Sequence, residues 1–331
     1  MGICLCNLSA DKLLEYAARN KLELTPASPN PSSFTADSAL VRELLGDLRE
    51  HLPDPIELIV GSAKARRGAS NLACHMWRGP LTGSCFLALS DELYVTSPEL
   101  TLLHQANQLH QANLAQMLGR YLGTWTPAPD KENGQETRAP LTTFESLNDF
   151  LMKTGRVMGK SNLKLAMAYT CEGAASGPET STQLVFCFPK EMHGFGLPLP
   201  IMNYGVDLSP ASQRLCGRES IRIDLCWRRA RFGIEYQGKE HGNQPGEDYA
   251  RWFAARKEGY ELWFVAKEQL EDAYQMNYIG REVAKRIGFT VDERKWPSEN
   301  ELQDLLDILS GRKSAAPVGY SELRGRRRVR K

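Results

Sequence analysis

The sequence of 331 residues contains no apolar run near the ~18 residues that a membrane-spanning helix requires. Its strongest run, Leu184–Phe188, is short. The N-terminus has no basic stretch followed by a long apolar segment, so we expect no secretory signal. None of the eight cysteines forms a CxxC pair, which argues against zinc-ribbon and thioredoxin motifs. We therefore expect a cytoplasmic protein with reduced thiols and no membrane partner.

The sequence also lacks an excess of charge of one sign, because the formal net charge is only +1. That value hides an asymmetry between the C-terminus and the rest of the chain. Residues 311–331 carry eight Lys or Arg and one Glu, so the remaining residues hold 33 basic and 39 acidic side chains, a net charge of −6. The pattern predicts a solvated basic tail, or alternatively an arm that contacts phosphates.

The composition is that of an ordinary globular protein, with 42% apolar and 24% charged residues. The length allows about two domains. Residues Pro127–Pro140 are polar, contain proline and lack periodicity, which is typical of a linker. We expect an N-terminal domain over 1–126, a linker over 127–140, a second domain over 141–310 and the tail over 311–331.

The N-terminal half predicts a mixed helix and strand domain. Helices are expected at Ala10–Asn20, near Asp37–His51 and from Ser97 to Gly123, where Pro98 and Glu99 mark a helix start. Four strands are expected from Ile56, Cys74, Ser84 and Glu92. A loop rich in proline and serine is expected at Thr25–Ser33.

The C-terminal half predicts an α+β fold. A helix opens at Ser176-Gly177-Pro178-Glu179, and the extended stretch GFGLPLPIMNYGV follows it. The remaining elements follow in the order strand, strand, helix, strand, helix, helix: Arg222–Trp227, Phe232–Gly238, Gly246–Glu258, Tyr260–Val265, Lys267–Ile287 and Glu299–Leu309. Two further helices are expected before Ser176, at Thr143–Lys153 and Ser161–Thr170. Helix, three strands, helix, strand is the order on which the fold class depends.

Two acidic residues are expected to meet across a hairpin. Four residues, RRAR, separate RIDLCW from FGIEYQG, and a turn centred between Arg229 and Ala230 places Asp224 opposite Glu235. Gln237 lies two residues further on, hence on the same face, while the alternate positions Ile223, Leu225, Ile234 and Tyr236 suit a core. Two ionised carboxylates this close repel each other, and a divalent cation removes the repulsion.

These residues predict a Mg²⁺ (or Mn²⁺) site. Mg²⁺ takes oxygen ligands and retains waters, and it can polarise a phosphodiester and activate a water molecule. Glu179, on the preceding helix, is the candidate third carboxylate. An ordinary half-exposed hairpin with an acidic outer face is the alternative.

The stretch Glu179…Asp224-x10-Glu235-x-Gln237 resembles the core of PD-(D/E)xK nucleases. More closely, RIDLCWRRARFGIEYQGKEH, followed by Arg251 and GYELWFV, resembles the very-short-patch-repair endonuclease-like family. This resemblance covers about 176–288. It implies a restriction-endonuclease-like core, preceded by a smaller mixed α/β domain, with DNA as the partner and no organic cofactor.

The resemblance also implies roles for the site residues. Asp224 and Glu235 would hold the metal, and Glu179 would assist through metal or water. Gln237 stands where the superfamily commonly has Lys; it can hydrogen-bond but carries no charge. Lys239 would partly substitute for that Lys, and His241 would transfer a proton.

Arginines surround the expected site. Arg222 is expected to face Gln237 across the hairpin. Arg251 either ties the following helix to the site or forms a surface pair on that helix. Both arginines are candidate contacts to the nucleic acid. Arg228, Arg229 and Arg231 occupy the hairpin end, where they either bind phosphates beside the scissile bond or form a solvated turn.

The N-terminal half is similar to proteins related to the abortive-infection type IV antitoxins, through Tyr94-Val95-x-Ser97-Pro98-Glu99 and the helix after it. The leading hypothesis is a Mg²⁺-dependent deoxyribonuclease of a bacterial phage-defence, repair or mobile-element system. The alternatives are a non-cleaving DNA-binding regulator of the antitoxin type and an interaction module with an acidic surface.

Overall fold

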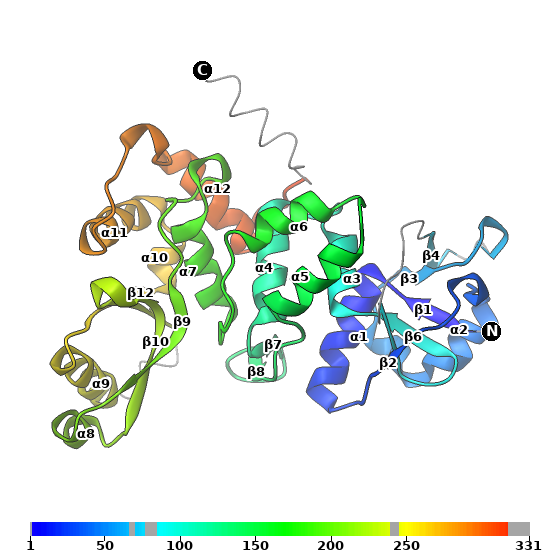
Figure 1. Ribbon diagram of the computed structural model, residues 1–331, viewed down its shortest axis with the longest axis horizontal. Coiled ribbons are helices and arrows are strands. Elements are labelled where there is room, and N and C mark those ends of the chain that lie inside the picture. Colours follow the sequence, from blue (N-terminus) through cyan, green and yellow to red (C-terminus); the bar gives the residue numbers. More distant parts are fainter. Residues whose placement is uncertain (1, 66–69, 77–84, 239–244, 317–331) are drawn as a thin grey trace. The chain divides into compact units, whose positions relative to one another are not determined.

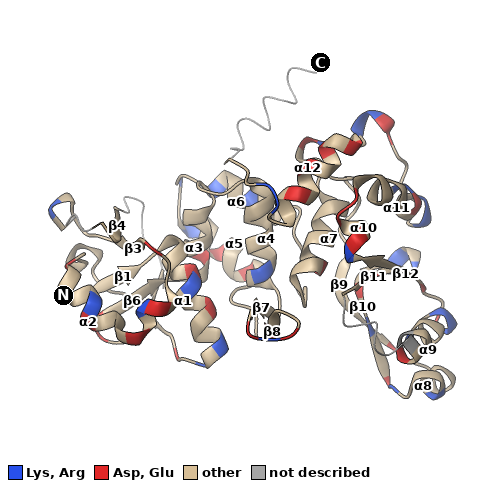
Figure 2. Cartoon of the chain, turned by 180° about the vertical axis from the view of Figure 1, so that it is seen from behind, with Lys and Arg blue, Asp and Glu red and all other residues tan. Residues whose placement is uncertain are grey.

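The computed structural model describes residues 2–65, 70–76, 85–238 and 245–316 (Figure 1). The fold is α+β, as expected, with separate mixed sheets in two compact units. One unit comprises residues 1–109 and 138–164, and the other comprises residues 110–137 and 165–331. Figure 2 shows that both acidic and basic residues occur in each unit. Within the described residues, no helix combines the length and apolar character needed to cross a membrane.

The first unit is built on a sheet with strand order β2-β5-β6-β1-β3-β4. Its strands are β1 (Ile3–Leu5), β2 (Thr25–Ala27), β3 (Ile56–Ile59), β4 (Leu72–His75), β5 (Phe86–Ala88) and β6 (Leu93–Thr96). Its helices are α1 (Asn7–Asn20), α2 (Ser38–Leu45), α3 (Pro98–Gln105) and α5 (Phe144–Lys153), and α6 (Lys160–Met167) begins in it. The strands at β3 to β6 match the expectation, whereas β1 and β2 fall in segments expected to have no strand.

The second unit contains a sheet with strand order β12-β11-β10-β9 and a separate β7–β8 hairpin. Its strands are β7 (Trp125–Pro127), β8 (Gln135–Thr137), β9 (Ile201–Asp207), β10 (Ser220–Trp227), β11 (Phe232–Gln237) and β12 (Glu261–Ala266). Its helices are α4 (Gln111–Leu122), α7 (Gly177–Cys187), α8 (Pro210–Cys216), α9 (Pro245–Lys257), α10 (Lys267–Leu270), α11 (Ala273–Arg286) and α12 (Glu299–Leu309). Strands β9, β10 and β11 form an antiparallel meander, and β12 runs parallel to β11 after α9.

The division into units differs from the expected boundaries at 126 and 141. The helix expected from Ser97 to Gly123 is two helices, because His110 caps a new one by accepting a hydrogen bond from the Ala112 amide. The second of these helices, α4, packs against α7 and α12 in the second unit. The expected linker carries the β7–β8 hairpin. Beyond it, Arg138 pairs with Glu15 in a buried salt bridge, so the chain returns to the first unit.

Helix α7 is the buried centre of the second unit. Ser176 caps its start by accepting a hydrogen bond from the Glu179 amide, and Pro178 lies in the first turn. All residues of α7 from Glu179 to Cys187 are buried, as expected of a helix that is enclosed on every side. Gly119 of α4 lies against Thr180, where an added Cβ would be only 2.4 Å from the Thr180 side chain.

Helix α9 covers part of the four-stranded sheet. Ala254 and Ala255 of this helix belong to a buried apolar cluster with Ile221 and Ile223 of β10 and Leu262 of β12. Helix α8 lies beside α9 (Figure 1). Helix α9 therefore packs against β10 and β12 of the sheet.

Candidate functional site

The β10–β11 hairpin has the register expected from the sequence. Leu225 pairs with Ile234, and Trp227 pairs with Phe232. A short 3₁₀ turn at Arg228–Ala230 and a left-handed residue, Arg231 (φ 49°), close the hairpin. Continued by one residue, this register places Asp224 opposite Glu235. The predicted hairpin centre between Arg229 and Ala230 is confirmed.

Asp224 departs from regular strand geometry. Its Oδ2 accepts a hydrogen bond of 2.8 Å from the backbone N–H of Tyr236, beside Glu235. On its other side, the β9–β10 ladder pairs Ile223 with Tyr204 and Leu225 with Met202, but Asp224 forms no pair with Asn203 in that ladder. The carboxylate of Asp224 is thereby drawn toward β11 and Glu235.

Asn203 is a site residue that the sequence analysis missed. It adopts a left-handed conformation (φ 47°), which asparagine tolerates better than most residues. Its Nδ2 donates hydrogen bonds to Glu179 Oε2 at 2.7 Å and to the Gly173 carbonyl at 3.0 Å. The only sequence signal was an asparagine interrupting an otherwise apolar extended stretch.

Glu179 lies beside this pair but its oxygens are already engaged. Oε2 accepts from the Ala175 N–H at 2.8 Å as well as from Asn203, and Oε1 accepts from Ser176 Oγ at 2.9 Å. These three donors favour the ionised carboxylate. Burial and the charge of Asp224 outweigh them and raise the pKa of Glu179 to about 7.

The three carboxyl groups interact electrostatically in a chain. Burial, followed by the charge of Glu235, raises the pKa of Asp224 well above its ordinary value. The charge of Asp224 in turn contributes to the raised pKa of Glu179. Glu235 itself is buried, at 7% exposure. Such a cluster holds excess negative charge that a proton or another cation must offset.

Arg251 supplies a positive charge to this cluster. Its Nη2 donates to Glu235 Oε2 at 3.0 Å and to the Arg222 carbonyl at 3.2 Å. The same guanidinium acts to lower the pKa of Asp224. The expected link between α9 and the site is therefore present, and it is an ion pair with a proposed metal ligand.

The remaining candidate residues lie on the same two strands or outside the described residues. Gln237 is half-buried at the end of β11, where it pairs in register with Ala266. Arg222 is exposed on β10. Lys239 and His241 lie outside the described residues.

The apolar positions of the hairpin are buried as expected at Ile223, Leu225 and Ile234, whereas Tyr236 is half-buried. Ile223 contributes to the cluster against α9, the helix that also carries Arg251. Its Cγ2 would lie 2.3 Å from a Cβ added to Gly233. Glycine at position 233 thus lets β10 and β11 approach closely, two residues from Glu235.

The acidic cluster offers a cation few protein ligands. In the described part of the chain, no group of three His, Cys, Asp or Glu is arranged to hold a metal ion. Mg²⁺ commonly binds through one or two carboxylates, with waters and substrate phosphates completing its shell. Asp224 and Glu235 fit that requirement, whereas the oxygens of Glu179 are committed to other donors.

No protein-family model, curated protein or solved structure matches this chain.

Proposed function

We propose that the chain is a metal-dependent DNA endonuclease that hydrolyses phosphodiester bonds. The observation that carries the proposal is the register-matched pair of half-buried Asp224 and buried Glu235, in which the charge of Glu235 raises the pKa of Asp224. The order α7, β9–β11 meander, α9, β12 is compatible with the restriction-endonuclease-like core implied by the sequence resemblance. That resemblance also supports a bacterial phage-defence, repair or mobile-element setting.

Asp224 and Glu235 would hold Mg²⁺ or Mn²⁺. When bound, such an ion polarises a phosphodiester oxygen and lowers the pKa of water. Asn203 and Ser176 fix the carboxyl group of Glu179 beside Asp224. Gln237 would orient water by hydrogen bonding, with Lys239 and His241 as further candidates for positioning and proton transfer.

The experiment is incubation of supercoiled plasmid with the purified protein and Mg²⁺ or Mn²⁺. Asp224→Asn and Glu235→Gln keep the side-chain shape but remove the charge, so nicking should fall by ~10²-fold or more. Glu261→Gln is the matched control, because Glu261 is an exposed carboxylate on β12 that bonds Trp263 and Arg286 away from the pair. Equal activity in all three variants would remove the proposed site.

A second candidate function is a non-cleaving DNA-binding regulator of the abortive-infection antitoxin type. It is favoured by the ion pair between Arg251 and Glu235, in which a guanidinium already offsets part of the acidic charge. The uncharged Gln237 favours it also. A regulator would bind DNA without divalent metal and would bind equally well after Asp224→Asn.

A further inference from the structure

A pocket opens at the turn end of the β10–β11 hairpin, the hairpin that also carries Asp224 and Glu235. It has a volume of ≈ 870 Å³, within the range of about 300–1,000 Å³ typical of small-molecule sites. Its lining combines three aromatic residues, Tyr204, Trp227 and Tyr260, with three cationic ones, Arg228, Arg229 and Arg231. We call it the hairpin-end pocket.

Its arginines carry charge that the described part of the protein does not neutralise. Elsewhere in this unit Arg218, Arg251 and Arg286 each pair with a carboxylate. Among the described residues, the three arginines of the pocket have no such ion pair. Arg231 Nη1 instead donates to the Glu258 carbonyl at 3.0 Å, which fixes that guanidinium at the pocket edge. The pocket therefore favours an anionic ligand.

Its aromatic residues suit a flat, apolar group. The rings of Tyr204 and Tyr260 lie 6.2 Å apart with a 44° interplanar angle. Arg228 lies over the first ring at 6.0 Å and Arg231 over the second at 5.9 Å. The rim adds apolar surface, since Leu199 and Ile201 are 46% and 47% exposed.

Phosphate binding alone would leave the exposed aliphatic side chains of Leu199 and Ile201 without a partner. A nucleobase has both flat faces and apolar surface, but in a duplex its faces are covered by stacking. Only an unpaired nucleotide can offer base and phosphate to the same concave site. The position agrees, because Arg228 follows the end of β10 and is four residues after Asp224, a span of at most about 13 Å at ~3.3 Å per residue.

We propose that the hairpin-end pocket binds an unpaired nucleotide of the DNA strand that crosses Asp224 and Glu235. The protein would thus act on single-stranded DNA or on an unpaired end rather than on continuous duplex. This inference rests on the proposed function for the identity of the strand as DNA. The binding itself requires no metal and no cleavage.

The test compares three fluorescent ligands in metal-free buffer: a short oligo-dT, an abasic strand of equal length and a blunt duplex. Oligo-dT should bind ~10-fold more tightly than the abasic strand, which keeps the phosphates but lacks bases. It should also bind more tightly than the duplex. Equal affinity for oligo-dT and the abasic strand, or preference for the duplex, would overturn the proposal.

Variants locate the binding. Tyr260→Leu should weaken oligo-dT binding ~10-fold, while Tyr260→Phe, which keeps the ring, should bind normally. Tyr278→Leu is the control, since Tyr278 is 66% exposed on α11 outside the pocket. Arg229→Gln should lower the salt dependence of binding, and Arg294→Gln, which removes an exposed arginine paired with Asp292, should not.

The two proposals fail separately. If oligo-dT binds in the pocket but Asp224→Asn does not alter plasmid nicking, the hydrolytic function is lost and the nucleotide site stands. If nicking depends on Asp224 but Tyr260→Leu binds oligo-dT as the parent does, the nucleotide site is lost and the hydrolytic function stands.

Discussion

The side-chain amide of Asn203, on β9, is hydrogen-bonded to Glu179 Oε2, at the start of α7, over 2.7 Å. This bond joins the edge strand of the sheet to the buried helix. It depends on the left-handed backbone of Asn203, which lets the amide leave the regular strand pattern. A residue in the middle of a strand thereby contributes to a site otherwise built from acidic side chains.

Substitution of Asn203 should separate conformation from hydrogen bonding. Asn203→Gly keeps access to positive φ and loses only the bonds, so we expect a loss of ~1–3 kcal/mol in unfolding free energy. Asn203→Ala should cost about 1 kcal/mol more, because alanine is strained in this conformation. Urea denaturation measures both. An alanine variant as stable as the glycine variant would contradict the role of the left-handed backbone.

The protonation of Glu179 should make stability depend on pH. The pKa of this group rises from 4.5 to about 7 on folding, so the folded state holds a proton that the unfolded state releases in this window. Stability should therefore be highest below pH 4.5, fall as the pH rises to about 7, and then level off. The upper limit is ~3 kcal/mol, at 1.36 kcal/mol per pKa unit.

Glu179→Gln should flatten that slope. Its amide nitrogen can replace Oε1 and donate to Ser176 Oγ, and it carries no titrating proton. Urea melts of both proteins between pH 5 and 8 provide the comparison. Carboxyls of lowered pKa, such as Glu258 at about 2, titrate below this range. Asp224, whose pKa is also raised to about 7, contributes a slope of the same sign in both proteins, so the difference between the two slopes reports Glu179. Equal slopes in the two proteins would show that Glu179 ionises normally.

Removal of Arg251 should strengthen divalent-cation binding. The guanidinium competes for Glu235 Oε2, and Arg251→Gln leaves that oxygen to the cation. We expect the affinity for Mn²⁺, measured by calorimetry, to rise by about 10-fold, equivalent to ~1.4 kcal/mol. Arg218→Gln, which breaks an exposed pair with Glu247, is the control. A weaker Mn²⁺ affinity after Arg251→Gln would indicate that Arg251 supports the cation site.

The close approach of β10 and β11 should be sensitive at Gly233. An added Cβ would lie 2.3 Å from Ile223 Cγ2 and 3.0 Å from Leu262 Cδ2, so Gly233→Ala should cost ~1–3 kcal/mol. Gly205→Ala in β9 is the matched control, because its Cβ would meet nothing within 4 Å. Thermal unfolding should rank the control close to the parent. Equal losses in both variants would refute close packing at Gly233.

The register of the β10–β11 hairpin was accessible from sequence because hairpin geometry is local. The turn length sets the register, and the alternation of apolar residues reports burial. Capping signals served equally well, since Ser176 caps α7 and the bounds of α12 match the expected Glu299–Leu309.

Features that depend on distant contacts were not accessible. The conformation of Asn203 follows from its bonds to Glu179 and Gly173, far away in sequence. The stretch Lys267–Ile287 reads as one helix, yet Asp272 caps a new helix by accepting a hydrogen bond from the Gln275 amide. The spacing of apolar residues alone does not distinguish one continuous helix from two consecutive helices whose apolar faces point to the same core.

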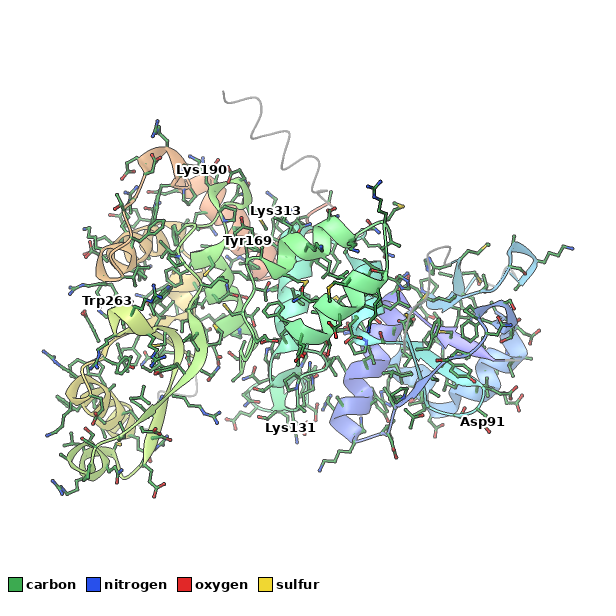
Figure 3. The ribbon with its side chains drawn as sticks, in the orientation of Figure 1. Asp91, Lys131, Tyr169, Lys190, Trp263 and Lys313 are labelled. Atoms are coloured by element: carbon green, nitrogen blue, oxygen red, sulfur yellow. The ribbon has the colours of Figure 1, made fainter. Side chains whose placement is uncertain are left out.

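The packing of Trp263 is another feature that depends on residues distant in sequence. This residue lies on β12 (Figure 3), where its ring packs against Phe232 and under Arg286 of α11. The structure leaves this tryptophan half-buried at the strand surface. Its neighbours come from β11 and α11, and the sequence of β12 alone does not predict them.

The strand order β12-β11-β10-β9 determines how firmly the backbone holds each residue of the acidic cluster. Glu235 stands on a strand held by ladders on both sides, whereas Asn203 stands on the outermost strand, held on one. Amide protons of β11 should exchange with solvent more slowly than those of β9. Asp224 and Glu235 thus stand on internal strands, and only Asn203, which binds Glu179, stands on the edge strand. A mutation or a bound ligand that shifts the edge strand β9 would move Asn203 and thereby change the hydrogen bonding and the pKa of Glu179.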